Sequence, residues 1–167
     1  MKCGVGDYSN NLAKALSVIP GIRVGVLTSF LKEKIEASSI DIFPTVKRWS
    51  LAELANVLKT IRRFSPDIVH LQYPTQGYGT GLLPWVLPIF CFLMRKKVVQ
   101  TWHEGYGRRD AWRLFLKSLV PSMLIFVRPR YSEKVLHPHL RWALWKKKSV
   151  FIPNASGIYR ACLTDTE

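Results

Sequence analysis

Hydrophobic and polar positions along the chain follow two different spacings, and the change from one to the other predicts strands and helices in alternation. Short apolar runs that are typical of strands fall at residues 22–28, 40–46, 67–71, 98–102, 122–127 and 150–152. Apolar residues at helical spacing predict helices at 8–18, 82–94, 110–119 and 131–145, and one more after residue 50. Mostly apolar strands that alternate with helices indicate an α/β fold. We expect a Rossmann-like, doubly wound, mostly parallel sheet with its ligand site at the carboxyl ends of the strands.

The helix after residue 50 carries its own start signals. Ser50 and Glu53 have the spacing of a capping box, and Trp49 and Leu54 have that of a hydrophobic staple. Residues predicted to face the core are Leu51, Leu54, Leu58 and Ile61 in this helix, and Trp112, Phe115 and Leu119 in a later one.

The apolar segment 82–94 is the strongest hydrophobic feature of the chain. Its 13 residues are fewer than the ~20 that a membrane-spanning helix needs, and Pro84 and Pro88 interrupt it. A buried helix is therefore favoured, although Arg95-Lys96-Lys97 directly afterwards leaves a membrane-dipping segment open. The absence of a signal-peptide pattern and an odd number of cysteines, three, fit a reducing cytoplasm.

The charge of the chain points to an anionic partner. With 25 Lys and Arg against 11 Asp and Glu, the formal net charge is +14. Nucleic acid, acidic lipid or a phosphorylated substrate would each suit this charge, as would solvated charge on a fragment whose acidic counterpart lies elsewhere. No nucleic-acid-binding signature is recognisable, so we expect no nucleic acid partner. Basic residues interleaved with tryptophan also suit an anionic membrane surface.

A glycine loop, Gly4-Val5-Gly6, leads into the first predicted helix. Its backbone amides could approach a phosphate at the positive helix end, although an ordinary glycine turn has the same pattern. Such a loop normally follows a strand, so either the pattern is a coincidence or the first strand of the fold is missing. A dinucleotide site also needs an acidic residue after the second strand, where Ser29 and Phe30 stand instead.

Polar side chains at predicted strand ends supply the remaining candidate chemistry. His103 follows the strand 98–102, where an imidazole could donate to a substrate or stabilise developing charge; a structural histidine is the alternative. Tyr73 ends the preceding strand and could line the site or pack as a core aromatic. His137 and His139 lack further ligands at useful spacing, and no pair of aspartates is separated by one residue, so no metal site is predicted.

Five ordered segments together resemble the N-terminal half of a GT-B glycosyltransferase of family 4. They are GVGDYSNNLAKAL (4–16), VGVLT (24–28), DIVHLQY (67–73), TWHE (101–104) and FIPNA (151–155). The resemblance implies transfer of a sugar from a nucleotide-sugar donor, with retained configuration and no cofactor or obligatory metal. We expect a lipid-linked or polysaccharide acceptor, which the basic, aromatic-rich character of the chain fits.

The same resemblance assigns roles to individual residues. Gly4, Val5 and Gly6 would approach the donor diphosphate, and His103 would be the catalytic residue that contacts the transferred sugar. Further candidates for acceptor or sugar contacts are Asp7, Tyr8, Tyr73 and Glu104.

The resemblance also implies that parts of the enzyme are missing. Residues 1–152 would form the acceptor-side domain, and 153–167 would begin a linker that carries Pro153 but has Ala155 where glycine is usual. The donor-binding domain and a central first strand before Cys3 would be absent. We therefore expect a partial enzyme, inactive alone, in the cytoplasm or peripheral on the inner membrane face. The alternatives are a non-catalytic basic domain that docks on anionic membrane or a partner chain, and an oxidoreductase fragment.

Overall fold

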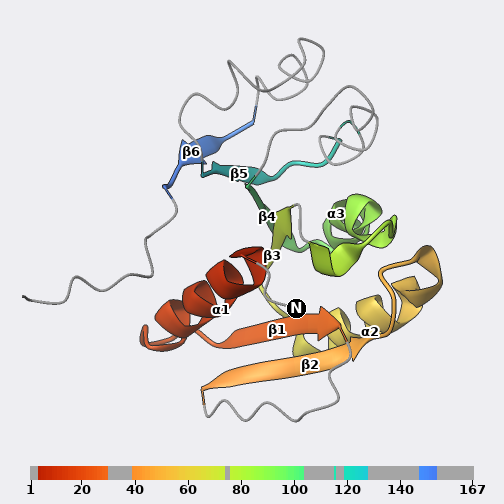
Figure 1. Cartoon of the computed structure of the whole chain (residues 1–167), viewed down its shortest axis with the longest axis horizontal. Coiled ribbons are helices and arrows are strands. Elements are labelled where there is room, and N and C mark those ends of the chain that lie inside the picture. Colours follow the sequence, from red (N-terminus) through yellow and green to blue (C-terminus); the bar gives the residue numbers. More distant parts are fainter. Residues whose placement is uncertain are drawn as a thin grey trace, which may run out of the picture.

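The structure, a computed structural model, describes residues 4–29, 39–73, 76–103, 115, 119–127 and 147–153 (Figure 1). The helices are α1 (Gly4–Ser17), α2 (Leu54–Phe64) and α3 (Leu83–Leu93), with short 3₁₀ turns η1 (Leu51–Glu53) and η2 (Gln76–Tyr78). The strands are β1 (Val24–Ser29), β2 (Ile40–Val46), β3 (Ile68–Tyr73), β4 (Lys97–Trp102), β5 (Met123–Phe126) and β6 (Ser149–Phe151).

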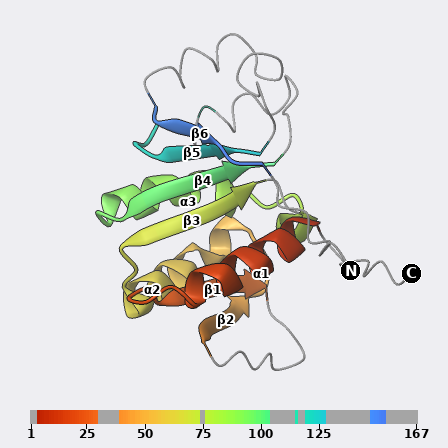
Figure 2. The same cartoon turned by 90° about the vertical axis from the view of Figure 1, so that its left-hand side faces the viewer.

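All strand pairs in the described part of the chain are parallel, which confirms the predicted α/β, Rossmann-like class. β1 pairs with β2, and a second sheet has the order β3-β4-β5-β6. In Figure 1, α1 lies on one face of the strands, and α2 and α3 lie on the other. Figure 2, turned by 90°, shows β3 to β6 stacked in order with α1 crossing in front of the region between β3 and β1.

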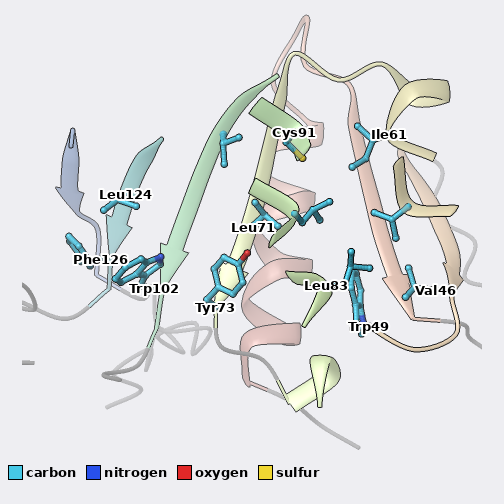
Figure 3. Packing of buried hydrophobic residues seen from close by; sticks show 13 residues of the cluster. Val46, Trp49, Ile61, Leu71, Tyr73, Leu83, Cys91, Trp102, Leu124 and Phe126 are labelled. Carbon is cyan, nitrogen blue, oxygen red and sulfur yellow. The ribbon is translucent and has the colours of Figure 1, made fainter. Parts of the chain in front are cut away.

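The core lies between the strands and the layer formed by α2 and α3 (Figure 3). Tyr73 and Trp102, at the ends of neighbouring strands, are fully buried, as is Leu83 in the first turn of α3. On the inner face of α2, the side chains of Val57 and Ile61 are buried. Burying side chains of this size contributes roughly 1.5–3 kcal/mol each, so this layer dominates the stability of the fold.

α1 begins earlier than the sequence predicts. The helix starts at Gly4 instead of residue 8, so Gly4 and Gly6 belong to its first turn and do not form a loop before it. Glycine weakens a helix mainly in its interior, and the first four N–H groups have no partner within the helix in any case. The helix ends at Ser17, close to Pro20 and to Gly21, whose positive φ of 80° suits glycine.

The predicted capping box is wrong. Ser50 makes no side-chain cap, and the chain forms the 3₁₀ turn η1 before α2 begins at Leu54. The Glu53 carboxylate instead accepts a hydrogen bond from Asn56 Nδ2 at 3.0 Å. The tighter turn also moves Leu51 out of line with the buried face of α2, and this side chain is half exposed.

Two further outcomes concern predicted helices. α3 confirms the buried helix: Leu87 and Cys91 are buried, and burial raises the pKa of the Cys91 thiol to about 12. No helix in the described ranges is both long and apolar enough to span a bilayer.

Phe115 and Leu119 are about half exposed, so their predicted inward orientation is wrong. Trp112, the rest of the predicted helix 110–119 and the predicted helix 131–145 lie outside the described residues.

Gly81 is a position where a side chain should not fit. A Cβ there would lie 2.0 Å from the Trp49 carbonyl oxygen, which accepts a hydrogen bond from the Leu83 amide at 3.1 Å. Because this obstacle is backbone, Gly81→Ala should lower the free energy of unfolding by about 3 kcal/mol in urea titrations. Gly4→Ala is the control, since no atom lies within 4 Å of its Cβ. Equal stability of the two variants would contradict this packing.

Candidate functional site

The candidate site lies at the carboxyl ends of β3 and β4. The register pairs Gln72 with Thr101 and Tyr73 with Trp102, and the His103 amide extends the ladder by donating to the Tyr73 carbonyl at 2.6 Å. Because side chains alternate between the faces of a sheet, Gln72, Thr101 and His103 share one face, and Tyr73 and Trp102 share the other. The polar side chains are thereby separated from the apolar ones that enter the core.

A chain of hydrogen bonds joins the polar side chains on this face. His103 Nε2 lies 2.8 Å from Gln72 Oε1, which can only accept, so in this amide orientation the His103 proton is on Nε2. Gln72 Nε2 lies 3.2 Å from His70 Nε2, and Thr101 Oγ1 lies 2.7 Å from the same nitrogen. When a neutral His70 carries its proton on Nδ1, these two donors share the single lone pair of Nε2. The chain of bonds therefore fixes both the orientation and the tautomer of the nearly buried His103 ring.

The first turns of α1 lie beside His103. The Tyr8 and His103 rings make an edge-to-face contact, with centroids 4.8 Å apart and planes at 79°. Burial raises the pKa of Tyr8, so its phenol is neutral at physiological pH. The Tyr8 contact brings the start of α1, with Gly4 and Gly6 exposed, to the edge where His103 lies. The unpaired amides and positive end of a helix favour anions at such a place.

The surroundings of His70 disfavour its protonation. Burial, together with a smaller contribution from the charge of His103, lowers the pKa of His70 to about 4. His70 is therefore neutral at physiological pH and can accept from Gln72 and Thr101. Because His70 is uncharged, it can hold Gln72, and through Gln72 the His103 ring, without itself attracting an anionic ligand.

The structure brings some of the predicted site residues together and separates others. His103, Tyr8 and the first turn of α1 meet at one edge. Tyr73 is fully buried and its hydroxyl donates to the Pro84 carbonyl, so this side chain belongs to the core. Asp7 is exposed in the first turn of α1. Glu104 lies outside the described residues, as do His137 and His139.

Sequence reasoning missed Gln72 and Thr101 as members of the site. The available signal was the two-residue spacing of His70 with Gln72 and of Thr101 with His103, which places each pair on one face of its strand. Only the pairing register, which sets Gln72 opposite Thr101, shows that both pairs lie on the same face of the sheet. In the part of the chain that the structure describes, no group of three His, Cys, Asp or Glu side chains could hold a metal ion.

Comparison with known proteins gives one match. The sequence profile described as Glycosyltransferase Family 4 matches residues 3–154, which is most of the 167-residue chain. The chain belongs to glycosyltransferase family 4. The family 4 match includes the start of α1, the polar ends of β3 and β4, and His103. Family 4 membership implies a sugar donor and an acceptor as substrates in general terms. No curated protein and no solved structure matches this family 4 chain significantly.

The partly buried His70 should make the stability of this family 4 domain depend on pH. The pKa of His70 is near 6.5 in the unfolded state and about 4 in the folded state. As pH falls, His70 is therefore protonated first in the unfolded state. Between pH 6.5 and 4 this difference should lower the free energy of unfolding by about 3 kcal/mol.

Urea unfolding of the wild type and of His70→Gln at pH 7 and pH 4 measures this effect. Titrations that both proteins share cancel in the comparison, so the variant should lose about 3 kcal/mol less between the two pH values. Equal losses would show that His70 is not held neutral.

Proposed function

We propose that this domain is the acceptor-side part of a retaining glycosyltransferase, which moves a sugar from a nucleotide-sugar donor to a lipid-linked or polysaccharide acceptor. The observation that carries the proposal is the fixed position of His103. Gln72 holds its ring at the carboxyl edge, and Tyr8 places the start of α1 beside it. A hydrogen-bonding group and a positive helix end thus lie together where parallel α/β folds bind ligands.

The arrangement suits the charge that develops in sugar transfer. As the bond between the anomeric carbon and the diphosphate breaks, the leaving diphosphate takes the electron pair and gains negative charge. Amides in the first turn of α1, at Gly4, Val5 and Gly6, would stabilise that charge, while His103 contacts the sugar. The acceptor hydroxyl then bonds the same carbon and gives up its proton to an oxygen of the leaving diphosphate. Asp7 and Tyr8 are further candidates for contacts with acceptor or sugar.

We further propose that this domain does not catalyse transfer by itself. In this proposal the described residues would contact only the diphosphate and the sugar, and the family resemblance assigns the nucleotide pocket to a second domain. A donor held by only one side of its site is bound weakly and is not positioned for attack.

Donor binding can be tested by NMR on the protein with labelled histidine and backbone amides. Addition of UDP-, GDP- and ADP-sugars at millimolar concentration should shift the resonances of His103 and of the first turn of α1 for at least one donor. Amides of β6, at the far edge of the sheet, serve as the internal reference. His103→Ala should weaken the apparent affinity about tenfold, the effect of one lost hydrogen bond to the sugar.

Two results would count against this proposal. Shifts confined to β6, or no shifts with any donor, would remove the assignment of the site. Sugar transfer or donor hydrolysis by the isolated domain, abolished by His103→Ala, would contradict its proposed inactivity.

A second candidate function, docking on an anionic membrane, has its own observation. Exposed basic and apolar side chains gather where α2 and α3 end, a surface that we call the basic-apolar patch. Lys96 Nζ lies 3.4 Å from Ser65 Oγ, which places these two helix ends side by side. The patch consists of Arg62, Arg63, Phe92, Leu93, Arg95 and Lys97, all exposed.

The chemistry of the patch fits the surface of an acidic bilayer. Phe92 and Leu93 are 45% and 69% exposed, and such side chains gain free energy on entering the interfacial region. Each basic residue near an anionic surface adds about 1 kcal/mol. Docking here would place the enzyme at the inner face of the cell membrane. It would also hold His103, at the opposite ends of six-residue strands, about 20 Å from the lipid surface.

Vesicle sedimentation tests this second function. The domain should bind vesicles that contain phosphatidylglycerol, bind pure phosphatidylcholine vesicles at least tenfold more weakly, and dissociate in high salt. Combined Phe92→Ser and Leu93→Ser substitutions should reduce binding about tenfold. Ile152→Ser, which alters a similarly exposed apolar residue beyond β6, should leave binding unchanged. Equal binding to both vesicle types would exclude this function.

A further inference from the structure

The side-chain amide of Gln72 lies between two imidazole rings. Its Oε1 atom is 2.8 Å from His103 Nε2, and its Nε2 atom is 3.2 Å from His70 Nε2. Both distances allow a hydrogen bond, and solvent competes little for these bonds, since His103 is buried and the other two side chains are half-buried. A primary amide accepts only at its oxygen and donates only at its nitrogen. The two histidines therefore meet opposite ends of one amide group.

This geometry restricts the protons of the two rings jointly. A neutral imidazole carries its proton on one nitrogen and a lone pair on the other. A histidine that bonds to the Gln72 oxygen must carry its proton on Nε2, whereas a histidine that bonds to the Gln72 amino group must carry it on Nδ1. Both bonds can form together only when the two rings hold opposite tautomers.

Two arrangements satisfy this condition. With the amide oriented as in the structure, His103 is protonated on Nε2 and His70 on Nδ1. Rotation of the Gln72 amide by half a turn would exchange its two ends and, with them, both tautomers. Every mixed arrangement sets two N–H groups or two lone pairs against each other, which costs a hydrogen bond in a half-buried place. The three side chains therefore change state as one unit.

Thr101 supports this unit without selecting one of its states. Its hydroxyl oxygen lies 2.7 Å from His70 Nε2, and its side chain is fully buried. A hydroxyl can donate to a lone pair or accept from an N–H group, so this bond suits either tautomer of His70. Among the described residues, the Gln72 side chain has no hydrogen-bond partner other than the two histidines. The orientation of its amide therefore depends on these rings.

We infer that Gln72 couples His70 to His103, so that the two rings hold opposite tautomers and exchange them together. His70 is thus a positioning residue, which acts on His103 through Gln72. With the amide as observed, His103 Nε2 donates to Gln72, and Nδ1 of the neutral ring is an acceptor. A sugar hydroxyl that meets Nδ1 would then be the donor of the hydrogen bond. Only this last step rests on the proposed function.

Coupling between two sites is reciprocal. A ligand that favours one tautomer of His103 also favours the opposite tautomer of His70, a ring that lies two residues before Gln72 on the same strand. Burial lowers the pKa of His70 to about 4, so this ring is neutral at physiological pH and has a defined tautomer there. His70 therefore reports on the state of His103 from outside the sugar contact.

Long-range proton–nitrogen NMR of the imidazole rings tests the coupling without any ligand. At about pH 8.5, well above the ordinary histidine pKa, the nitrogen shifts of neutral rings show which atom carries the proton. In the wild type, His70 should be protonated on Nδ1 and His103 on Nε2. Spectra of His70→Gln and His103→Ala assign the signals. The same tautomer at both rings would overturn the inference.

Gln72→Glu should change one tautomer and keep the other. A carboxylate accepts at both oxygens, so both rings should then be protonated on Nε2, and the tautomer ratio of His70 should change at least tenfold. Thr101→Val is the matched control, since it removes the hydroxyl beside His70 and leaves the amide in place. The control should keep opposite tautomers. An unchanged His70 in Gln72→Glu, or matching tautomers in Thr101→Val, would contradict coupling through the amide.

Gln72→Met keeps the inference testable if Gln72→Glu does not fold. Methionine has a similar length and no amide, so it should uncouple the two rings. His103→Ala should change the tautomer ratio of His70 about tenfold when Gln72 is present and leave it unchanged in the Met background. Equal effects in both backgrounds would overturn the inference. Because no sugar donor is added, failure of the coupling leaves donor binding at His103 to its own test, and failure of donor binding leaves the coupling intact.

Discussion

The parallel register of β3 with β4 is the constraint on which the candidate site depends. It sets Gln72 opposite Thr101 and places His103 one position beyond the last pair, where its amide still bonds to β3. A shift of one residue would turn either strand over and send its polar side chains into the core. The same alternation that buries Tyr73 and Trp102 against α3 therefore gathers His70, Gln72, Thr101 and His103 beside α1.

Aromatic side chains hold the rest of the fold to this pair of strands. Phe64 ties the end of α2 to β1, and it also packs on Phe43 of β2 at a ring distance of 5.5 Å. Trp49 connects the end of β1 to Tyr78, and its carbonyl oxygen binds the first amide of α3. These contacts keep the two sheets aligned although no described strand joins them. They explain why α1 can lie across β1 and β3 and reach His103 with Tyr8.

The sequence predicted all six described strands because their apolar runs are short and bounded by polar or turn residues. β2 has the predicted bounds, and the predicted starts or ends of β1, β3, β4, β5 and β6 differ by one or two residues. Helix starts were harder to predict, since they depend on which local hydrogen bond is formed. Glu53 bonds to Asn56 and not back to the Ser50 amide, and α1 includes two glycines that a pattern of apolar residues cannot assign to a helix. Tyr73 illustrates the same limit, because its burial depends on α3 packing over the end of β3.

By itself the sequence determined the alternation of strands and helices, the parallel sheet, the family and the position of His103 at a strand end, because local spacing and ordered motifs carry this information. Only the tertiary structure decided which polar residues share a face, that His70 is neutral, and that β1 and β3 lie apart beneath one helix. These properties arise from register, desolvation and packing between segments that are distant in the sequence. No pattern within one segment contains them.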